Sequence, residues 1–267
     1  QILLGIVIGL FLPNTDFHLN TELFLALVIG PLLFRESEEA DITAILKHWR
    51  IIIYLIFPVI FISTLSLGGL AHLLWFSLPL AACLAVGAAL GPTDLVAFAS
   101  LSERFSFPKR VSNILKGEGL LNDASGLVAF QVALTAWTTG AFSLGQASSS
   151  LIFSILGGFL IGFLTAMTNR FLHTFLLSVR ATDIASELLL ELSLPLVTFF
   201  LAEEVHVSGI IAVVVAGILK ASRFKKITLL EAQVDTVTET VWHTVNFMLN
   251  GSVFVILGME LEKIGRA

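Results

Sequence analysis

Long apolar runs, separated by short links, constrain this chain more than any other feature. Hydrophobic residues make up 56% of the 267 residues and charged residues only 13%, about half the roughly 25% typical of soluble domains. A soluble protein of this size could not cover its surface with so few charges. The runs are continuous and lack the alternation typical of barrel strands. The sequence therefore predicts an all-α polytopic membrane protein.

A membrane-spanning helix needs about 20 mostly apolar residues. On that basis we expect about nine spans, forming one transmembrane domain over residues 1–267 with no soluble domain: 1–12, 20–35, 50–75, 77–101, 110–137, 148–173, 184–202, 207–221 and 241–261. We expect residues 140–150 to form a loop and 222–240 to form a polar helix at the membrane interface. Since the first run opens without a Met, we expect a chain truncated at both ends.

The basic residues alternate between successive links, which predicts the orientation. Lys and Arg are concentrated in every second link, at 35–50, 102–110, 170–182 and 220–226, although Lys263 and Arg266 at the far end break the pattern. Because cytoplasmic loops carry the excess of Lys and Arg, these four links should face the cytoplasm of a multi-pass cell-membrane protein. The formal charge of −5 and the lack of a long basic run exclude nucleic acid as a partner.

Among the ionisable residues inside predicted spans, three carboxylates stand out: Asp94, Glu118 and Asp123. Each would cost about 2.5–3.5 kcal/mol at the centre of a lipid-exposed helix, so such residues usually line ion or proton paths. A structural carboxylate hydrogen-bonded within the bundle is the alternative for any one of them. Three on consecutive spans favour a cation and proton path, because a carboxylate in a hydrated cavity can hold either ion.

Asp94 follows a helix-breaking sequence, Gly91-Pro92-Thr93. Proline removes a backbone donor and clashes with the preceding turn, so the fourth span should break or kink there. Backbone carbonyls freed at membrane depth coordinate cations in transporters. A simple proline kink is the alternative, but Thr93 and Asp94 both offer oxygen ligands and favour a cation site.

The next span carries the second polar group. Glu118 and Asn122 are four residues apart and share a helix face, while Asp123 lies about 100° further round. Gly119 and Gly126 would allow a neighbouring backbone to approach closely. Hard oxygen ligands of this kind suit Na⁺ or another hard cation rather than a transition metal.

At these residues the sequence resembles the monovalent cation/proton antiporters, specifically the bacterial-type sodium/proton exchanger branch with an Asn-Asp pair. The most specific match is Gly117-Glu118-Gly119-Leu120-Leu121-Asn122-Asp123, and Thr93-Asp94-Leu95 corresponds to the family's Thr-Asp-Pro. Supporting similarity covers almost the whole chain, at Pro31–Phe34, His48–Arg50, Pro108–Arg110, Val207–Gly217 and Leu249–Gly258.

The resemblance implies an inverted-repeat antiporter fold with a broken helix, and a core bundle that moves against a dimerising scaffold, so a homodimer is expected. It implies exchange of Na⁺, or K⁺ or Li⁺, for H⁺ by alternating access in the lipid bilayer, for pH and sodium homeostasis, with no cofactor. Asp123 would bind cation and proton in turn. Thr93, Asp94 and Asn122 would complete the monovalent cation site, and Glu118 would form a structural ion pair with an arginine on a later helix.

The chain departs from the family pattern at several positions. Gly119 replaces a serine that often helps bind the cation, and Leu95 replaces the usual proline. Phe34-Arg35-Glu36 stands where many relatives have Phe-Glu, which leaves a third acidic contributor open between Glu36 and none. About three later helices of the family, including one that carries the arginine, have no counterpart before Ala267, and the first helix is also expected to be missing.

Rival functions fit the sequence less well. A K⁺/H⁺ antiporter of the same fold is the main alternative, because Na⁺ and K⁺ both bind hard oxygens. An intramembrane aspartyl protease would be an enzyme with an aspartate dyad, but its Tyr-Asp and Gly-x-Gly-Asp contexts are not those of Asp94 and Asp123. A passive channel would need a filter loop, and none is evident. The sequence therefore favours a secondary transporter over an enzyme.

Overall fold

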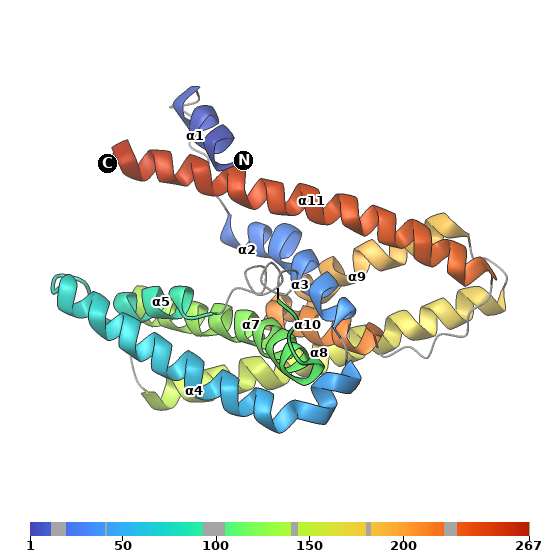
Figure 1. The fold of residues 1–267 in the computed structure, drawn as a ribbon, viewed down its shortest axis with the longest axis horizontal. Coiled ribbons are helices and arrows are strands. Elements are labelled where there is room, and N and C mark those ends of the chain that lie inside the picture. The colour runs from blue at the N-terminus through green and yellow to red at the C-terminus, as the bar shows by residue number, and fades with distance from the viewer. Residues whose placement is uncertain are drawn as a thin grey trace.

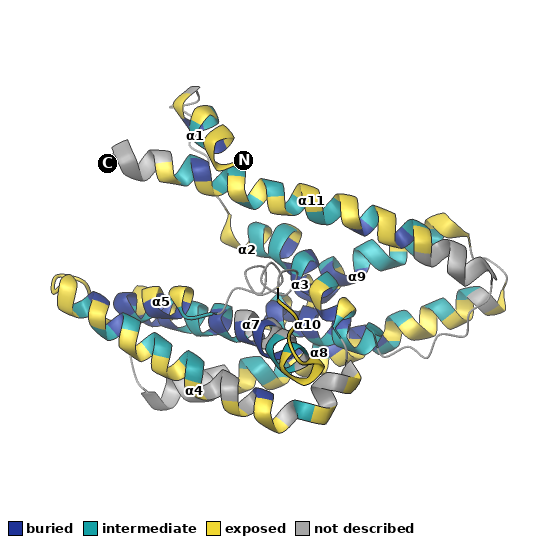
Figure 2. Cartoon of the chain, viewed as in Figure 1, coloured by how far each residue is buried: buried dark blue, intermediate teal, exposed yellow. Residues whose placement is uncertain are grey.

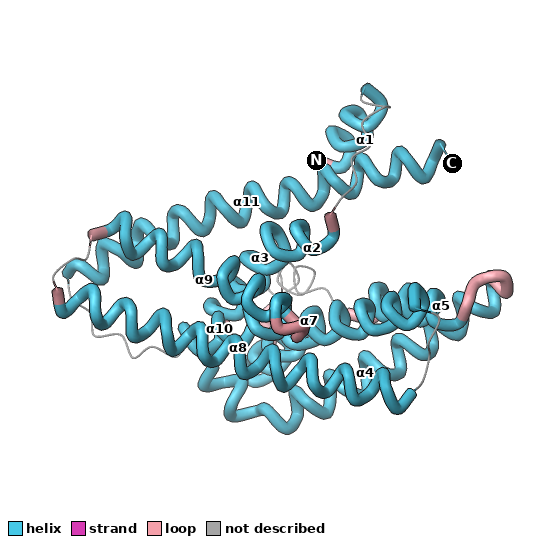
Figure 3. Tube along the Cα trace, turned by 180° about the vertical axis from the view of Figure 1, so that it is seen from behind, coloured by secondary structure: helices cyan, strands magenta, loops and turns pink. Residues whose placement is uncertain are grey.

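The computed structural model describes residues 1–11, 20–40, 42–92, 105–139, 144–179, 183–221 and 229–266. Within these ranges every regular element is a helix, as Figure 3 shows along the Cα trace. The elements, labelled as in Figure 1, are α1 (Ile2–Phe11), α2 (Thr21–Phe24), the π-helical turn η1 (Leu25–Ile29), α3 (Gly30–Glu39), α4 (Ile42–Leu74), α5 (Leu80–Leu90), α7 (Lys109–Thr139), α8 (Leu144–Ser178), α9 (Ile184–Glu204), α10 (Gly209–Ala221) and α11 (Leu229–Arg266). The all-α prediction is confirmed.

Two predicted boundaries were wrong. Residues 229–240 do not form a separate interfacial helix but make up the first turns of α11, and residues 144–150 belong to α8 rather than to a loop. The stretch 229–240 contains neither Gly nor Pro, and polar residues alone do not end a helix. The backbone of α11 therefore stays helical where its residues change from polar to apolar. The change in residue type reflects the solvent around the helix and not the end of a helix.

Three of the described helices contain stretches that are long and apolar enough to cross a membrane: Ile152–Leu176, Ile184–Glu204 and Thr236–Leu261. Shorter apolar stretches lie at Pro58–Leu74, Leu80–Leu90 and Gly209–Ala221. The polar and glycine-rich centre of α7 lowers its hydropathy, although that helix runs over Lys109–Thr139. Helix length and composition agree with an integral membrane protein.

The helices pack in distinct groups (Figure 1). One group consists of α4, α5 and α7, each in contact with the other two, and a second group places α3, α8 and α9 around α10. Contacts of α7 with α3, α8 and α10 join the two groups, and α1 packs along α11. Residues far apart in sequence are thus brought together around α7 and α10.

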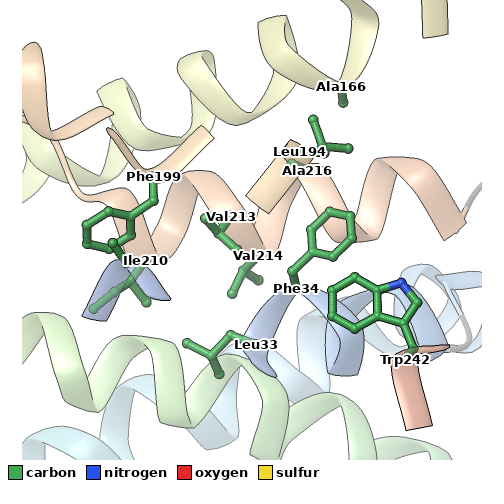
Figure 4. Packing of buried hydrophobic residues seen from close by; sticks show 11 residues of the cluster. Leu33, Phe34, Ala166, Leu194, Phe199, Ile210, Val213, Val214, Ala216 and Trp242 are labelled. Atoms are coloured by element: carbon green, nitrogen blue, oxygen red, sulfur yellow. The ribbon is translucent and has the colours of Figure 1, made fainter. Parts of the chain in front are cut away.

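The largest cluster of buried side chains surrounds α10. Figure 4 shows Phe34 and Trp242 beside Val213 and Val214 of α10, with Phe199 at the other end. Figure 2 shows how burial differs among the helices. Helix α10 is mostly buried, while α4 and α11 expose much of their length. The exposed side chains of these outer helices are largely apolar, among them Phe61, Ile62, Phe247 and Met248. Such a surface suits contact with lipid.

Candidate functional site

The helix of the fourth predicted span, 77–101, ends inside that span, as predicted. Helix α5 ends at Leu90, and Gly91 and Pro92 follow outside the helix. Proline at 92 cannot donate a backbone hydrogen bond and would clash with the preceding turn, so the helix ends before it. The two predicted ligands that follow, Thr93 and Asp94, lie outside the described residues.

The polar centre of α7 contains a buried side-chain pair. The amide nitrogen Nδ2 of Asn122 donates a hydrogen bond of 3.0 Å to Oε1 of Glu118. Asn122 is fully buried, and Glu118 is 6% exposed. The four-residue spacing predicted a shared face, and this hydrogen bond confirms it.

Asp123 occupies the next position of α7. Its backbone is helical, and its side chain lies outside the described part of the structure. Its assignment as the ion-coupling carboxylate therefore stays a prediction. The same holds for a partner of Glu118 on a later helix.

Glycine packing brings α7 against the break in α5. A Cβ atom built on Gly126 would lie 2.3 Å from Cγ of Pro92, a separation that atoms cannot adopt, so only glycine allows this approach. Gly126 lies four residues after Asn122, on the same face of the helix. The face of α7 that carries Asn122 is thereby turned toward α5.

Helix α4 approaches a neighbouring face of α5 in the same way. A Cβ atom on Gly87 would lie 2.4 Å from the carbonyl oxygen of Thr64, and one on Gly91 would lie 2.7 Å from Oγ of Ser63. The end of α5 therefore packs against both α4 and α7.

This arrangement brings together groups of the kind that bind cations. A helix end with a Pro92 break leaves backbone carbonyls without helical donors. The buried Asn122 amide lies one turn, and the buried Glu118 carboxyl two turns, from Gly126, which contacts Pro92. Among the described residues, no three His, Cys, Asp or Glu side chains converge as a transition-metal site would require. Oxygen chemistry of this kind suits a hard monovalent cation.

Comparison with known proteins decides the family. Residues 1–264 match the family described as "Sodium/hydrogen exchanger, transmembrane". The chain belongs to the sodium/hydrogen exchanger family.

Members of this exchanger family resemble the chain over nearly all of its length. It is 38% identical over 264 residues to the sodium, potassium, lithium and rubidium/H(+) antiporter of Bacillus subtilis, and the match covers 99% of this chain and 39% of that protein. It is 28% identical over 280 residues to the Na(+)/H(+) antiporter NhaH of Halobacillus aidingensis, covering all of this chain and 68% of the relative.

A solved exchanger shows the same fold. The sodium proton antiporter MjNhaP1 from Methanocaldococcus jannaschii superposes with a TM-score of 0.66 at 20% identity, over 97% of this chain and 64% of that structure. The prediction of an antiporter-type fold is confirmed. The chain spans about two fifths of the length of the Bacillus subtilis relative.

Sequence reasoning missed a charge network where α3, α9, α10 and α11 meet. Arg35 pairs with Glu38 at 3.0 Å and with Glu39 at 2.7 Å. Lys220, whose side chain is 7% exposed, pairs with Glu38 at 3.1 Å and with Glu191. The indole Nε1 of Trp242 donates a 3.2 Å hydrogen bond to the same Glu191 carboxylate. The pairs of Arg35 with Glu38 and Glu39 have the local spacing of helix neighbours. The partners of Lys220 and Trp242 lie on separate helices, so sequence patterns give no signal for them.

Two further acidic residues, one in a predicted span and one in the link after it, also have structural partners. Glu187 of α9 lies 3.1 Å from Nε2 of His173 on α8, and Glu203 accepts a 3.2 Å hydrogen bond from the backbone nitrogen of Gly209 at the start of α10. Glu36, the open third acidic contributor, lies on α3 with an exposed side chain. Its part in ion binding stays a prediction.

Proposed function

We propose that the full-length protein containing this chain is a secondary antiporter that exchanges Na⁺ or another monovalent cation for H⁺ by alternating access. The observation that carries the proposal is the contact of Gly126 with Pro92. It joins the break in α5 to the helix face that holds the buried Asn122–Glu118 pair. A broken helix beside buried oxygen ligands near the middle of the spans is the arrangement by which secondary transporters bind coupling ions.

Within this proposal each residue has one role. Asp123 binds the cation when ionised and releases it when protonated. Thr93 and Asp94 contribute from the broken-helix side and Asn122 from α7, while Glu118 serves as a structural charge that holds Asn122 in place. The 3.0 Å hydrogen bond between Asn122 and Glu118 supports the last assignment.

The transported ion need not be Na⁺ alone. The Bacillus subtilis relative is named for sodium, potassium, lithium and rubidium. Because all four ions bind hard oxygens, K⁺/H⁺ exchange is the second candidate, and Li⁺ is a further substrate. We also propose that the protein works in the cell membrane as a homodimer, without a cofactor, in sodium and pH homeostasis.

A vesicle assay tests the function. Everted vesicles containing the full-length protein are energised to an acid interior, and the pH is followed after pulses of Na⁺, Li⁺ and K⁺. We expect cation-dependent alkalinisation of the interior that Asp123→Asn abolishes for every cation. Asp183→Asn, at an exposed helix cap far along the chain from this site, serves as the control with normal exchange. Cation-driven proton movement that persists in Asp123→Asn would place the coupling group elsewhere, with Asp94 next to be tested.

A further inference from the structure

Two adjacent hydroxyl side chains, Ser63 and Thr64, interrupt the apolar sequence of α4. They lie near the middle of the expected span 50–75, at the depth where secondary transporters place their ion sites. Both residues are half-buried rather than lipid-exposed. Their neighbours Phe61, Ile62 and Leu65 are exposed and apolar, as lipid contact requires. The hydroxyls therefore belong to the protein-facing side of α4.

Ser63 lies against the break in α5. Its Oγ would be 2.7 Å from a Cβ atom on Gly91, the residue before Pro92. The absence of a side chain at 91 thus leaves room for the Ser63 oxygen. One turn earlier, Gly87 packs in the same way on the backbone carbonyl of Thr64. Gly87 in α5 and Gly91 just after it thus allow α4 to lie at close range.

The Ser63 hydroxyl is oriented as an acceptor. It donates a 3.1 Å hydrogen bond to the carbonyl oxygen of Ile60 in its own helix, which directs its proton away and leaves its lone pairs available. The neighbouring Oγ1 of Thr64 is buried and has no hydrogen-bond partner among the described residues. Buried hydroxyls without partners are costly, and a bound ion or water is a usual explanation for such a group.

The face of α7 that approaches Pro92 carries a glycine on either side of Asn122. Gly119, Asn122 and Gly126 recur along the helix at the spacing of one face, and two of the three have no side chain. Because Gly126 rests on Pro92 while Ser63 rests on Gly91, both α7 and α4 contact the chain at the break. A hard cation at this break could therefore draw oxygen ligands from both helices.

We propose that Ser63 Oγ coordinates the transported monovalent cation at the break in α5 and helps to set the preference among Li⁺, Na⁺ and K⁺. This inference rests on the proposed exchange function and adds a ligand from α4 to it. Nothing in the sequence pattern singled out Ser63, since it lies in a span without an acidic residue. Its role follows from its contact with Gly91.

The experiment measures the apparent Km for Li⁺, Na⁺ and K⁺ in vesicles containing the full-length protein. Ser63→Ala should raise the Km for Na⁺ roughly three- to tenfold, the effect of losing one polar contact, and should change the ratios among the three ions. Ser63→Cys keeps the size of the side chain but replaces a hard oxygen with a soft sulfur, so it should show a similar loss. Ser66→Ala, which removes an exposed hydroxyl from the same helix, is the matched control.

The outcomes distinguish a failure of the Ser63 inference from a failure of the proposed exchange function. Exchange by the unsubstituted protein with equal Km values in Ser63→Ala and Ser66→Ala would overturn the role of Ser63 and leave the antiporter proposal intact. A uniform shift for all three ions together with a lower melting temperature would also overturn it, because that pattern indicates packing. An unsubstituted protein that exchanges none of the ions would overturn both proposals.

Discussion

The Asn122 amide and the Glu118 carboxylate, one helical turn apart in α7, are joined by a 3.0 Å hydrogen bond inside the protein. Both side chains are buried. The interior of the protein has a low dielectric constant, which strengthens this hydrogen bond. For the same reason, a buried amide that lost its acceptor would be costly, because water could not replace the acceptor. The pair therefore fixes the position of the residue that precedes Asp123.

We expect Glu118→Ala to destabilise the protein by about 1–3 kcal/mol, because it leaves a buried donor without this acceptor. Thermal unfolding of the purified protein and the yield of folded protein measure the effect. Glu204→Ala, at an exposed position on α9, should be neutral. A variant at 118 with normal stability but a large change in apparent Na⁺ affinity would instead make Glu118 a member of the ion site.

The two glycines Gly126 and Gly69 provide a test of the close packing between α7 and the end of α5. A methyl group at 126 would collide with Pro92, whereas nothing lies within 4 Å of the corresponding position at 69. We expect Gly126→Ala to destabilise the protein by about 1–3 kcal/mol through overpacking and to impair exchange. Gly69→Ala should be neutral or stabilising by up to about 1 kcal/mol, since alanine favours the helix. Equal melting temperatures for the two variants would contradict the close packing of α5 on α7.

The sequence predicted the helices and the break far better than the side-chain partners. Hydrophobic run length located the spans, and proline chemistry at Pro92 located the end of α5. Both are local properties of the chain. The spacing of Glu118 and Asn122 likewise predicted their shared face, because four residues make about one helical turn.

Contacts between separate helices could not be predicted in this way. Lys220 and Glu191 lie on different helices, and their pairing depends on how α9 packs against α10. The contact of Ser63 with Gly91 depends on the register between α4 and α5. Hydrophobic patterns indicate which face of a helix is buried, but they do not fix the register between helices.

Asp183, the residue that caps α9, gives a pH-dependent prediction. Hydrogen bonds from the side chain and backbone of Ser186 lower the pKa of the Asp183 carboxyl below its ordinary value of 3.8. The ionised form is thus favoured by folding. Its contribution to stability is fully present above pH 3.8 and is lost as the pH falls through the lowered pKa.

The test compares the wild type with Asp183→Asn, since asparagine also caps helices well but does not titrate. We expect the wild type to have the higher melting temperature at neutral pH, because a negative charge also favours the helix N-terminus. That advantage should shrink at pH values below about 4. A difference that stays constant with pH would show that the charge of Asp183 does not contribute.

Orientation in the membrane can be tested at two exposed serines in opposite links. Ser77 lies between α4 and α5 in a link without Lys or Arg, and Ser178 lies at the end of α8 beside Arg180. Because the basic links should be cytoplasmic, Ser178→Cys should react with an impermeant thiol reagent only from the cytoplasmic side, and Ser77→Cys only from outside. The native Cys83 is buried and should give little background. Labelling of both positions from the same side would contradict the predicted topology.

The last prediction concerns the charge moved in each transport cycle. If Asp123 alone binds the cation and the proton in turn, one negative charge balances one cation, and the neutral Asn122 beside it adds no further proton. Exchange should then be one-for-one and electroneutral, so an imposed membrane potential should not drive it. Proteoliposomes containing the full-length protein, with a potential set by a gradient of the permeant anion thiocyanate, measure this through the rate of Na⁺-driven pH change. Asn122→Asp, which places a second carboxylate beside the first, is the informative comparison, because it would allow an extra proton to be carried. Clear acceleration of the wild type by the potential would show that a second ionisable group, with Asp94 the first candidate, shares the coupling with Asp123.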